Sequence, residues 1–159
     1  MSTPYQPQVI IYTDGSSRGN PGPGGVGVVL MAGQHRKEMS EGFRLTTNNR
    51  MELMAVIKGL EALKKPGLRV VVYSDSQYVV NAVEKGWLQG WLRTNFKGGK
   101  KNPDLWVRFH NIYKQHHVRF VWVKGHADNA YNNRCDELAT AAADGHHLHI
   151  DGWFEANRD

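Results

Sequence analysis

A chain of 159 residues, of which 40% are hydrophobic and 22% charged, with a net charge of +5, has the composition of one globular domain and not of a disordered or fibrous protein. No apolar run is long enough to cross a membrane, and the N-terminal residues lack the basic and apolar regions of a signal peptide. Cys135 is the only cysteine, which excludes an internal disulfide and favours a cytoplasmic location.

The first half of the chain predicts three strands before any long helix begins. Residues 8–14 (QVIIYTD) are rich in Val and Ile and predict a buried strand. Residues 15–25 consist almost entirely of Gly, Ser, Asn and Pro, which predicts a turn with too little apolar surface to pack. Two further strands are expected over residues 26–31 and 37–43, so the chain should open as a three-stranded antiparallel meander.

The second half alternates between helical and strand patterns. Apolar residues from Leu53 to Leu63 recur at helical spacing, and Pro66-Gly67 stops that helix. The elements expected after it are a strand at 69–74, a helix at 76–84, a helix at 103–116, a strand at 118–123 and a helix at 132–144. Strand–helix–strand order implies parallel pairing, so we expect an α/β fold with a mixed sheet and helices on its faces. We expect one domain over residues 1–159, with a core at about 8–144 and a patternless tail at 145–159.

Two aspartates occupy matching positions at the ends of predicted strands. Asp14 lies in the sequence YTDG and Asp75 in the sequence YSDS. The carboxyl ends of neighbouring strands in an open α/β sheet form a ligand crevice, so both acids should face one site. Two carboxylates repel each other there, and a divalent cation such as Mg²⁺ would offset that repulsion. The alternative interpretation is that each aspartate only begins a turn.

Two further acids fall early in predicted helices. Glu52 follows Asn49 by three residues, the spacing of a capping box, so the local sequence alone favours a helix cap. Asp136 follows Asn133 by the same spacing, and Asn132 lies one helical turn before Asp136 on the same face. Both acids are therefore open to a structural or a catalytic interpretation, and composition cannot bring all four acids together.

The excess of positive charge is confined to residues 85–101. The rest of the chain carries 15 basic and 15 acidic residues, whereas this segment has no acidic residue and contains Lys85, Arg93, Lys97, Lys100 and Lys101. A polyanion would bind such a patch because contact releases the counterions condensed on its phosphates, although a solvated basic loop would look the same. Trp87 and Trp91 share one helical face here. We expect Trp87 mainly to contact a ligand and Trp91 mainly to pack.

Six short motifs, in order along residues 8–144, resemble the type 1 ribonucleases H, and most closely their bacterial members. These motifs are YTDGS at 12–16, NPGPGG at 20–25, TTNNRME at 46–52, DSQY at 75–78, VKGH at 123–126 and NNRCD at 132–136. Any one of them is a weak pattern, but the whole series in the order of the family is highly specific.

The resemblance implies the fold of that family, a mixed five-stranded sheet of an antiparallel meander and parallel strands flanked by helices. It implies an endoribonuclease that hydrolyses the RNA strand of RNA–DNA hybrids by metal-dependent in-line phosphoryl transfer, leaving 5′-phosphate and 3′-hydroxyl ends. The implied cofactor is Mg²⁺, with Mn²⁺ as an alternative and one or two ions per site. The metal ligands and catalytic residues are implied to be Asp14, Glu52, Asp75 and Asp136, and His126 matches the catalytic histidine of the family.

The resemblance also implies which residues bind the hybrid. The matching positions are Gly15, Asn20, Asn48, Gln77 and Asn132, together with Trp87 and Lys97 in a basic segment that resembles the handle of the family. Amide side chains suit this role because they both donate to and accept from the 2′-hydroxyl that distinguishes RNA from DNA. The stretch from Trp91 to Trp106 departs from the family pattern, since it is shorter and contains Gly98-Gly99. Lysines in that stretch therefore cannot be matched one by one.

The expected partner is an RNA–DNA hybrid, bound by a monomer with no obligate protein partner and no membrane association. A non-catalytic hybrid-binding module is the alternative. Such a module would need the basic segment and the amide residues, but it would not need four acids. A transposase or integrase core would share the acids, but it would lack the amide set and the handle.

Overall fold

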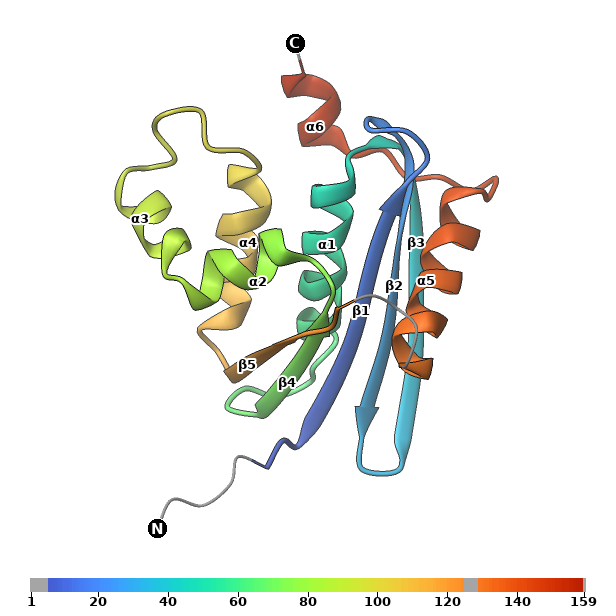
Figure 1. The fold of residues 1–159 in the computed structure, drawn as a ribbon, viewed down its shortest axis with the longest axis vertical. Helices are drawn as coiled ribbons and strands as arrows, with labels where there is room; N and C mark the ends of the chain where they lie inside the picture. Colours follow the sequence, from blue (N-terminus) through green and yellow to red (C-terminus); the bar gives the residue numbers. More distant parts are fainter. Residues whose placement is uncertain (1–5, 125–128, 159) are drawn as a thin grey trace.

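A five-stranded sheet organises the computed structural model, which describes residues 6–124 and 129–158 (Figure 1). The strands are β1 (Val9–Ser17), β2 (Gly22–Ala32), β3 (His35–Thr46), β4 (Arg69–Ser74) and β5 (His117–Trp122). Their order across the sheet is β3-β2-β1-β4-β5, in which β1, β2 and β3 pair antiparallel while β4 pairs parallel with both β1 and β5. The predicted mixed sheet is therefore confirmed.

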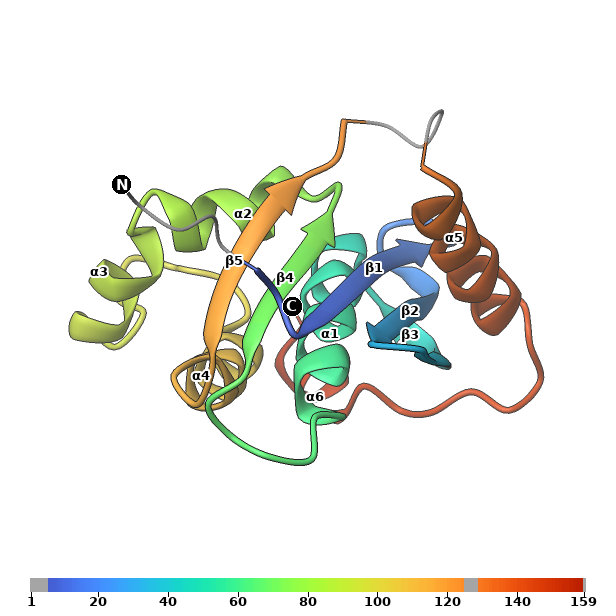
Figure 2. The same ribbon diagram turned by 90° about the horizontal axis from the view of Figure 1, so that it is seen from below.

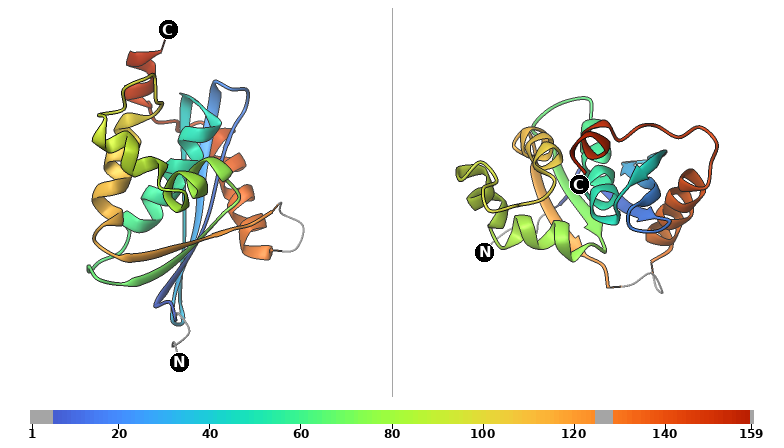
Figure 3. Two further views of the ribbon diagram at one scale, coloured as in Figure 1. Left: turned by 60° about the vertical axis from the view of Figure 1, so that its left-hand side comes forward. Right: turned by 90° about the horizontal axis from the view of Figure 1, so that it is seen from above.

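The helices cover the two faces of this sheet unequally. They are α1 (Asn48–Glu61), α2 (Gln77–Glu84), α3 (Trp87–Arg93), α4 (Pro103–Tyr113), α5 (Ala130–Ala143) and α6 (Gly152–Asn157). Helices α1, α2 and α4 lie on one face, and α5 lies on the other over the antiparallel strands (Figures 2 and 3). The main core forms between the sheet and the first group, around Ile11, Ile57 and Trp106, all fully buried. No helix within the described ranges is long and apolar enough to cross a membrane.

Glycines in β2 allow α5 to lie directly on the strand. A Cβ atom at Gly25 would lie 2.1 Å from the Ala139 carbonyl oxygen, and one at Gly27 would lie 2.1 Å from the Cys135 carbonyl oxygen. No side chain fits at either position, because the backbone of α5 cannot shift away without losing its packing on the sheet. Glycine is therefore used here for close approach of two backbones and not for a turn.

The prediction of a turn over residues 15–25 is wrong for most of these residues, which belong to strands. Strand β1 continues to Ser17, strand β2 begins at Gly22, and Gly15 to Ser17 pair with Val26 to Gly24. The composition is misleading because these glycines lack apolar side chains, yet their backbones pair in the sheet and pack against helices. Only residues 18–21 remain as the turn between the two strands.

Helix α4 is shorter than predicted, and the tail is more ordered. Helix α4 ends at Tyr113, three residues before the expected end, and His116 turns inward to accept a hydrogen bond from the Leu68 amide at 3.3 Å. The tail expected to have no pattern forms α6 and a backbone bridge to β3. In that bridge the Arg44 amide donates to the His149 carbonyl at 2.9 Å, and the His149 amide donates to the Gly42 carbonyl at 2.8 Å.

Candidate active site

The register of the parallel pair β1–β4 brings two acids to the same end of the sheet. The last paired residues are Tyr12 and Tyr73, and Asp14 and Asp75 each follow two residues later. Asp75 comes directly after β4, as predicted, but Asp14 lies inside β1, because that strand continues along β2. The acids therefore meet where β4 has ended and β1 has not.

Glu52 reaches the same point from the first turns of α1. Its side chain is 5% exposed, and one of its carboxylate oxygens accepts a short hydrogen bond from the Gly15 amide. The Gly15 amide also donates to Asp14 at 2.9 Å. A Cβ atom at Gly15 would lie 2.2 Å from the Met51 carbonyl carbon, so only glycine allows α1 to come this close to β1.

The capping interpretation of Glu52 and Asp136 is wrong. The N-cap of α1 is Thr47, whose hydroxyl accepts from the Arg50 amide at 3.3 Å. The N-cap of α5 is Asn129, which accepts from the amides of residues 131 and 132. Both helices begin earlier than the sequence suggested, so both acids lie past the cap and their carboxylates are available to the pocket.

Three carboxylates converge closely enough to share one cation. Oxygens of Asp14, Glu52 and Asp75 all lie within 4.8 Å of one another, and they form the one group of metal-ligand type within residues 6–124 and 129–158. Burial, followed by the nearby charges of Asp14 and Asp75, raises the pKa of Glu52 well above its ordinary value of 4.5. An all-oxygen cluster that resists carrying its own negative charge is the donor set that a hard divalent cation stabilises.

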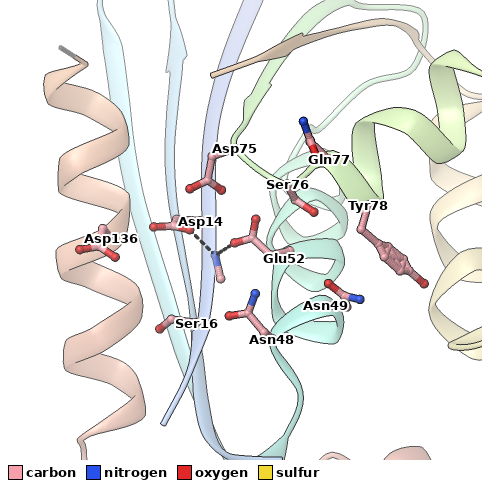
Figure 4. Close-up of a pocket in the computed structure, with 11 residues that line it drawn as sticks. Asp14, Ser16, Asn48, Asn49, Glu52, Asp75, Ser76, Gln77, Tyr78 and Asp136 are labelled. Carbon is pink, nitrogen blue, oxygen red and sulfur yellow. Dashed lines mark hydrogen bonds between the residues drawn. The ribbon is translucent and has the colours of Figure 1, made fainter. Parts of the chain in front are cut away.

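Asp136 faces the same pocket from the other side of the sheet. The pocket has a volume of about 420 Å³ and is lined by Asp14, Gly15, Ser16, Asn48, Asn49, Glu52, Asp75, Ser76, Gln77, Tyr78 and Asp136 (Figure 4). Asp136 comes from α5 and does not belong to the group of oxygens within 4.8 Å among the residues described. The structure therefore brings three of the four predicted acids together tightly and places the fourth in the lining of the same pocket.

The residues expected to bind substrate fall into three places. Gly15, Asn48 and Gln77 line the pocket, and Asn20 lies beside it, where its side-chain oxygen accepts from the Asn48 amide at 3.1 Å. Asn132 is fully buried and lies outside the pocket lining, and neither atom of its amide has a hydrogen-bond partner in the described part of the chain. His126 lies outside the described residues.

Four residues of the pocket lining are absent from the predicted site: Ser16, Asn49, Ser76 and Tyr78. Asn49, interpreted as a helix cap, is exposed at the second position of α1 and lines the pocket. Ser76 caps α2, where its hydroxyl accepts from the Val79 amide at 3.2 Å, and it also lines the pocket. The position of Asn49 within the TTNNRME motif was the signal that could have identified it.

The basic segment projects on α3 and the loop that follows (Figure 1). Trp87 is 46% exposed, with the Lys85 ammonium 5.5 Å from its ring centroid. Trp91 packs edge-on against the buried Trp106, with the two ring centroids 5.7 Å apart, so its predicted packing role is confirmed. Lys97 is exposed. The contact roles of Trp87 and Lys97 remain predictions.

Comparison with known proteins places this fold and pocket in a family. Residues 6–144 match the family model described as RNase H. A protein named Ribonuclease H from Syntrophus aciditrophicus (strain SB) is 58% identical over 142 residues, which cover 87% of this chain and 82% of that protein.

Solved structures agree with that assignment. The crystal structure of LC9-RNase H1, a type 1 RNase H with the type 2 active-site motif, is 32% identical, with a TM-score of 0.79 and coverage of 99% of this chain and 84% of that one. The crystal structure of LC11-RNase H1 in complex with RNA/DNA hybrid is 29% identical, with a TM-score of 0.63 and coverage of 86% and 96%.

Replacing Glu52 with Gln should stabilise the metal-free protein. The folded state raises the pKa of Glu52, so the wild type loses stability as pH rises from about 4.5 through the folded pKa, whereas the amide does not titrate. The variant should therefore gain in melting temperature over the wild type across that pH range. Thermal unfolding in a chelating buffer, from pH 4 to pH 8, measures this difference. A difference that stayed constant with pH would mean that Glu52 is not destabilised by ionisation in the fold.

Proposed function

The chain belongs to the ribonuclease H family and is an endoribonuclease acting on RNA–DNA hybrids, and we propose that Asp14, Glu52, Asp75 and Asp136 form its catalytic centre. The observation that carries this proposal is the convergence of three carboxylates within 4.8 Å in the lining of a polar pocket. A binding module would gain nothing from this arrangement, since three converging acids, two of them buried, repel the phosphates of the ligand.

We propose Mg²⁺ as the cation that these acids hold, with Mn²⁺ as the alternative and one or two ions per site. The donor set fits, because it consists of carboxylate oxygens and leaves an open side toward the pocket for water and phosphate. When bound, such ions supply charge stabilisation at the scissile phosphate and a more acidic water. The expected reaction is in-line hydrolysis that leaves 5′-phosphate and 3′-hydroxyl ends.

The chain's own residues would position both the acids and the substrate. The Gly15 amide donates to Asp14 and to Glu52, so it fixes two of the carboxylates relative to each other. Asn48 and Gln77 line the pocket and Asn20 lies beside it, and we propose that their side-chain amides read a 2′-hydroxyl in the minor groove of a hybrid. Asn132 is fully buried in α5 and lies outside the pocket lining, so we propose no direct contact between its side chain and the ligand.

The site is built from one chain, which supports action as a monomer. Its acids come from β1, α1, α5 and the end of β4, all in the same copy. We propose a monomeric enzyme in the cytoplasm, with no obligate protein partner and no membrane association. Cys135 is buried, and its thiol pKa is raised to about 12 by burial, so it offers no ready intermolecular disulfide.

Replacing Asp75 with Asn should abolish cleavage, because the amide keeps the shape of the side chain but loses the charge that holds a cation. We expect the rate to fall by about 10²-fold or more, as when a group that stabilises transition-state charge is removed. Labelled RNA–DNA, RNA–RNA and DNA–DNA duplexes, each with and without Mg²⁺, measure activity and specificity together. Asp144→Asn is the matched control, since Asp144 is an exposed acid paired with Arg18. Near-native turnover by Asp75→Asn would remove that residue from the catalytic set.

Replacing Lys97, Lys100 and Lys101 with Ala should raise KM and flatten its dependence on salt, while kcat changes little. These lysines would neutralise phosphates and take no part in the chemistry. With each lost contact, fewer counterions are released on binding, which lowers both the affinity and its dependence on salt. Steady-state kinetics at several salt concentrations measures both effects. A control that changes Lys37, Lys64 and Lys65 to Ala removes the same charge from exposed positions elsewhere. Equal responses of the two triple variants would show that only net charge matters.

Replacing His126 with Ala should lower kcat by roughly 10²-fold and leave KM nearly unchanged, as for a positioned acid–base group. We propose His126 for proton transfer or product release, on the strength of its place in the VKGH motif. Mg²⁺ affinity, measured by calorimetry, should stay at the wild-type value. An unaltered kcat would exclude His126 from the mechanism, and a lost affinity would make it a metal ligand.

A further inference from the structure

A buried arginine occupies the first turn of α1, where a positive charge is unfavourable. Arg50 is 1% exposed and stands three residues after the N-cap, at the end of the helix that its dipole makes positive. Burying a cation at such a place costs free energy unless carboxylates surround it. Two carboxylates, those of Asp104 and Asp151, offset that cost at Arg50. This arrangement indicates that the orientation of Arg50 has a specific role.

The two carboxylates come from segments far apart in the sequence. Asp104, in the first turn of α4, accepts from both terminal nitrogens of the guanidinium at 2.8 Å. Asp151, directly before α6, accepts from Nε at 2.7 Å and from Nη2 at 2.9 Å. Trp153 covers the guanidinium, with its ring centroid at 5.1 Å. Two bidentate pairs in different directions leave the side chain a single orientation.

Asp151 also joins the C-terminal segment to the end of β3. Its carboxylate, 5% exposed, accepts from the Thr46 hydroxyl at 2.7 Å, one residue before the Thr47 cap of α1. Helix α6 lies at the end of the molecule where α1 begins (Figure 1). Asp151 and α6 both lie beyond residues 6–144, the part that matches the family model. The segment is therefore attached at the helix turn that borders the pocket.

The same turn carries residues of the pocket opening. Asn48 and Asn49 directly precede Arg50, line the pocket and have exposed side chains. The backbone N–H of Asn48 donates to the side-chain oxygen of Asn20 at 3.1 Å, so the turn also holds the loop between β1 and β2. Glu52 is fixed separately by the Gly15 amide. A shift of the first turn would therefore move the amide side chains more than it would move the acids.

We propose that Asp151 is a positioning residue for hybrid binding, which acts through Arg50 to orient Asn48 and Asn49. The C-terminal segment is then a working part of the substrate site, although none of its residues lines the pocket within the described ranges. This inference rests on the proposed function, since it assumes that a hybrid lies across Asn48. Loss of Asp151 should therefore weaken substrate binding, seen in KM and Kd, while kcat stays near the wild-type value.

Asp151→Asn tests the inference, because it keeps the shape and an oxygen for Thr46 but turns an amide group toward Arg50. We expect KM for a hybrid to rise about fivefold, the size of effect found for residues coupled to a site without contacting the ligand. The value of kcat should stay within about twofold. The Kd for an uncleaved hybrid in EDTA, measured by fluorescence anisotropy, should rise by the same factor as KM. All assays are run at a temperature where circular dichroism shows every variant folded.

Glu155→Gln is the matched control, since Glu155 ties the same segment to β3 through an exposed bidentate pair with Arg44 and does not touch Arg50. It should leave KM, kcat and Kd unchanged. If Asp151→Asn does not fold, Asp104→Asn breaks the other pair on Arg50 and should give the same rise in KM and Kd.

A lower melting temperature with unchanged KM and Kd would overturn the proposal and make the network purely structural. An equal rise in Glu155→Gln would also overturn it. A wild-type protein that cuts no hybrid would instead contradict the proposed function, and the Kd comparison in EDTA would still decide the role of Asp151.

Discussion

Mutual repulsion among three converging carboxylates, two of them buried, is the constraint that the rest of the structure must balance. Asp14, Glu52 and Asp75 lie within 4.8 Å of one another, and burial together with this proximity raises the pKa of Glu52. A metal-free fold can hold such a group only if other interactions are strong enough to oppose it. The core between the sheet and α1 supplies that opposition, because Leu53, Val56 and Ile57 beside Glu52 are fully buried. Packing of α1 on the sheet thus opposes the repulsion among the acids.

Close backbone approach is the means by which the acids converge. Gly15 lets α1 touch β1, and Gly25 and Gly27 let α5 touch β2. The contact at Gly15 brings α1, which carries Glu52, against β1, which carries Asp14. The other two contacts hold α5, which carries Asp136, against β2, the neighbour of β1. A side chain at any of these glycines would push a helix outward and with it one ligand of the proposed cation. Glycine in this sheet therefore serves the geometry of the site as well as the packing of the fold.

The first turn of α1 is held from both sides. Toward the pocket, Glu52 accepts a hydrogen bond from the Gly15 backbone N–H, and the Asn48 backbone N–H donates to the Asn20 side chain. Away from the pocket, Arg50 bonds Asp104 and Asp151. The acidic centre and the buried ion network are thus two ends of one helical turn, which links the C-terminal segment to the place where a hybrid would bind.

Strand and helix positions were largely determined by local sequence, because periodicity reports which face of an element is buried. The strand at Arg69–Ser74 and the helix at Gln77–Glu84 match the prediction, and six motifs in series predicted the family that the family model confirms. Local sequence failed where a residue's role depends on a distant partner. The glycines of β1 and β2 looked like a loop because the helices that cover them lie far along the chain. Glu52 looked like a cap for a related reason, since its hydrogen-bond donor, Gly15, is 37 residues away. The tail showed no pattern because Asp151 is ordered by Arg50 and Thr46, and only the tertiary structure could bring these charges and donors together.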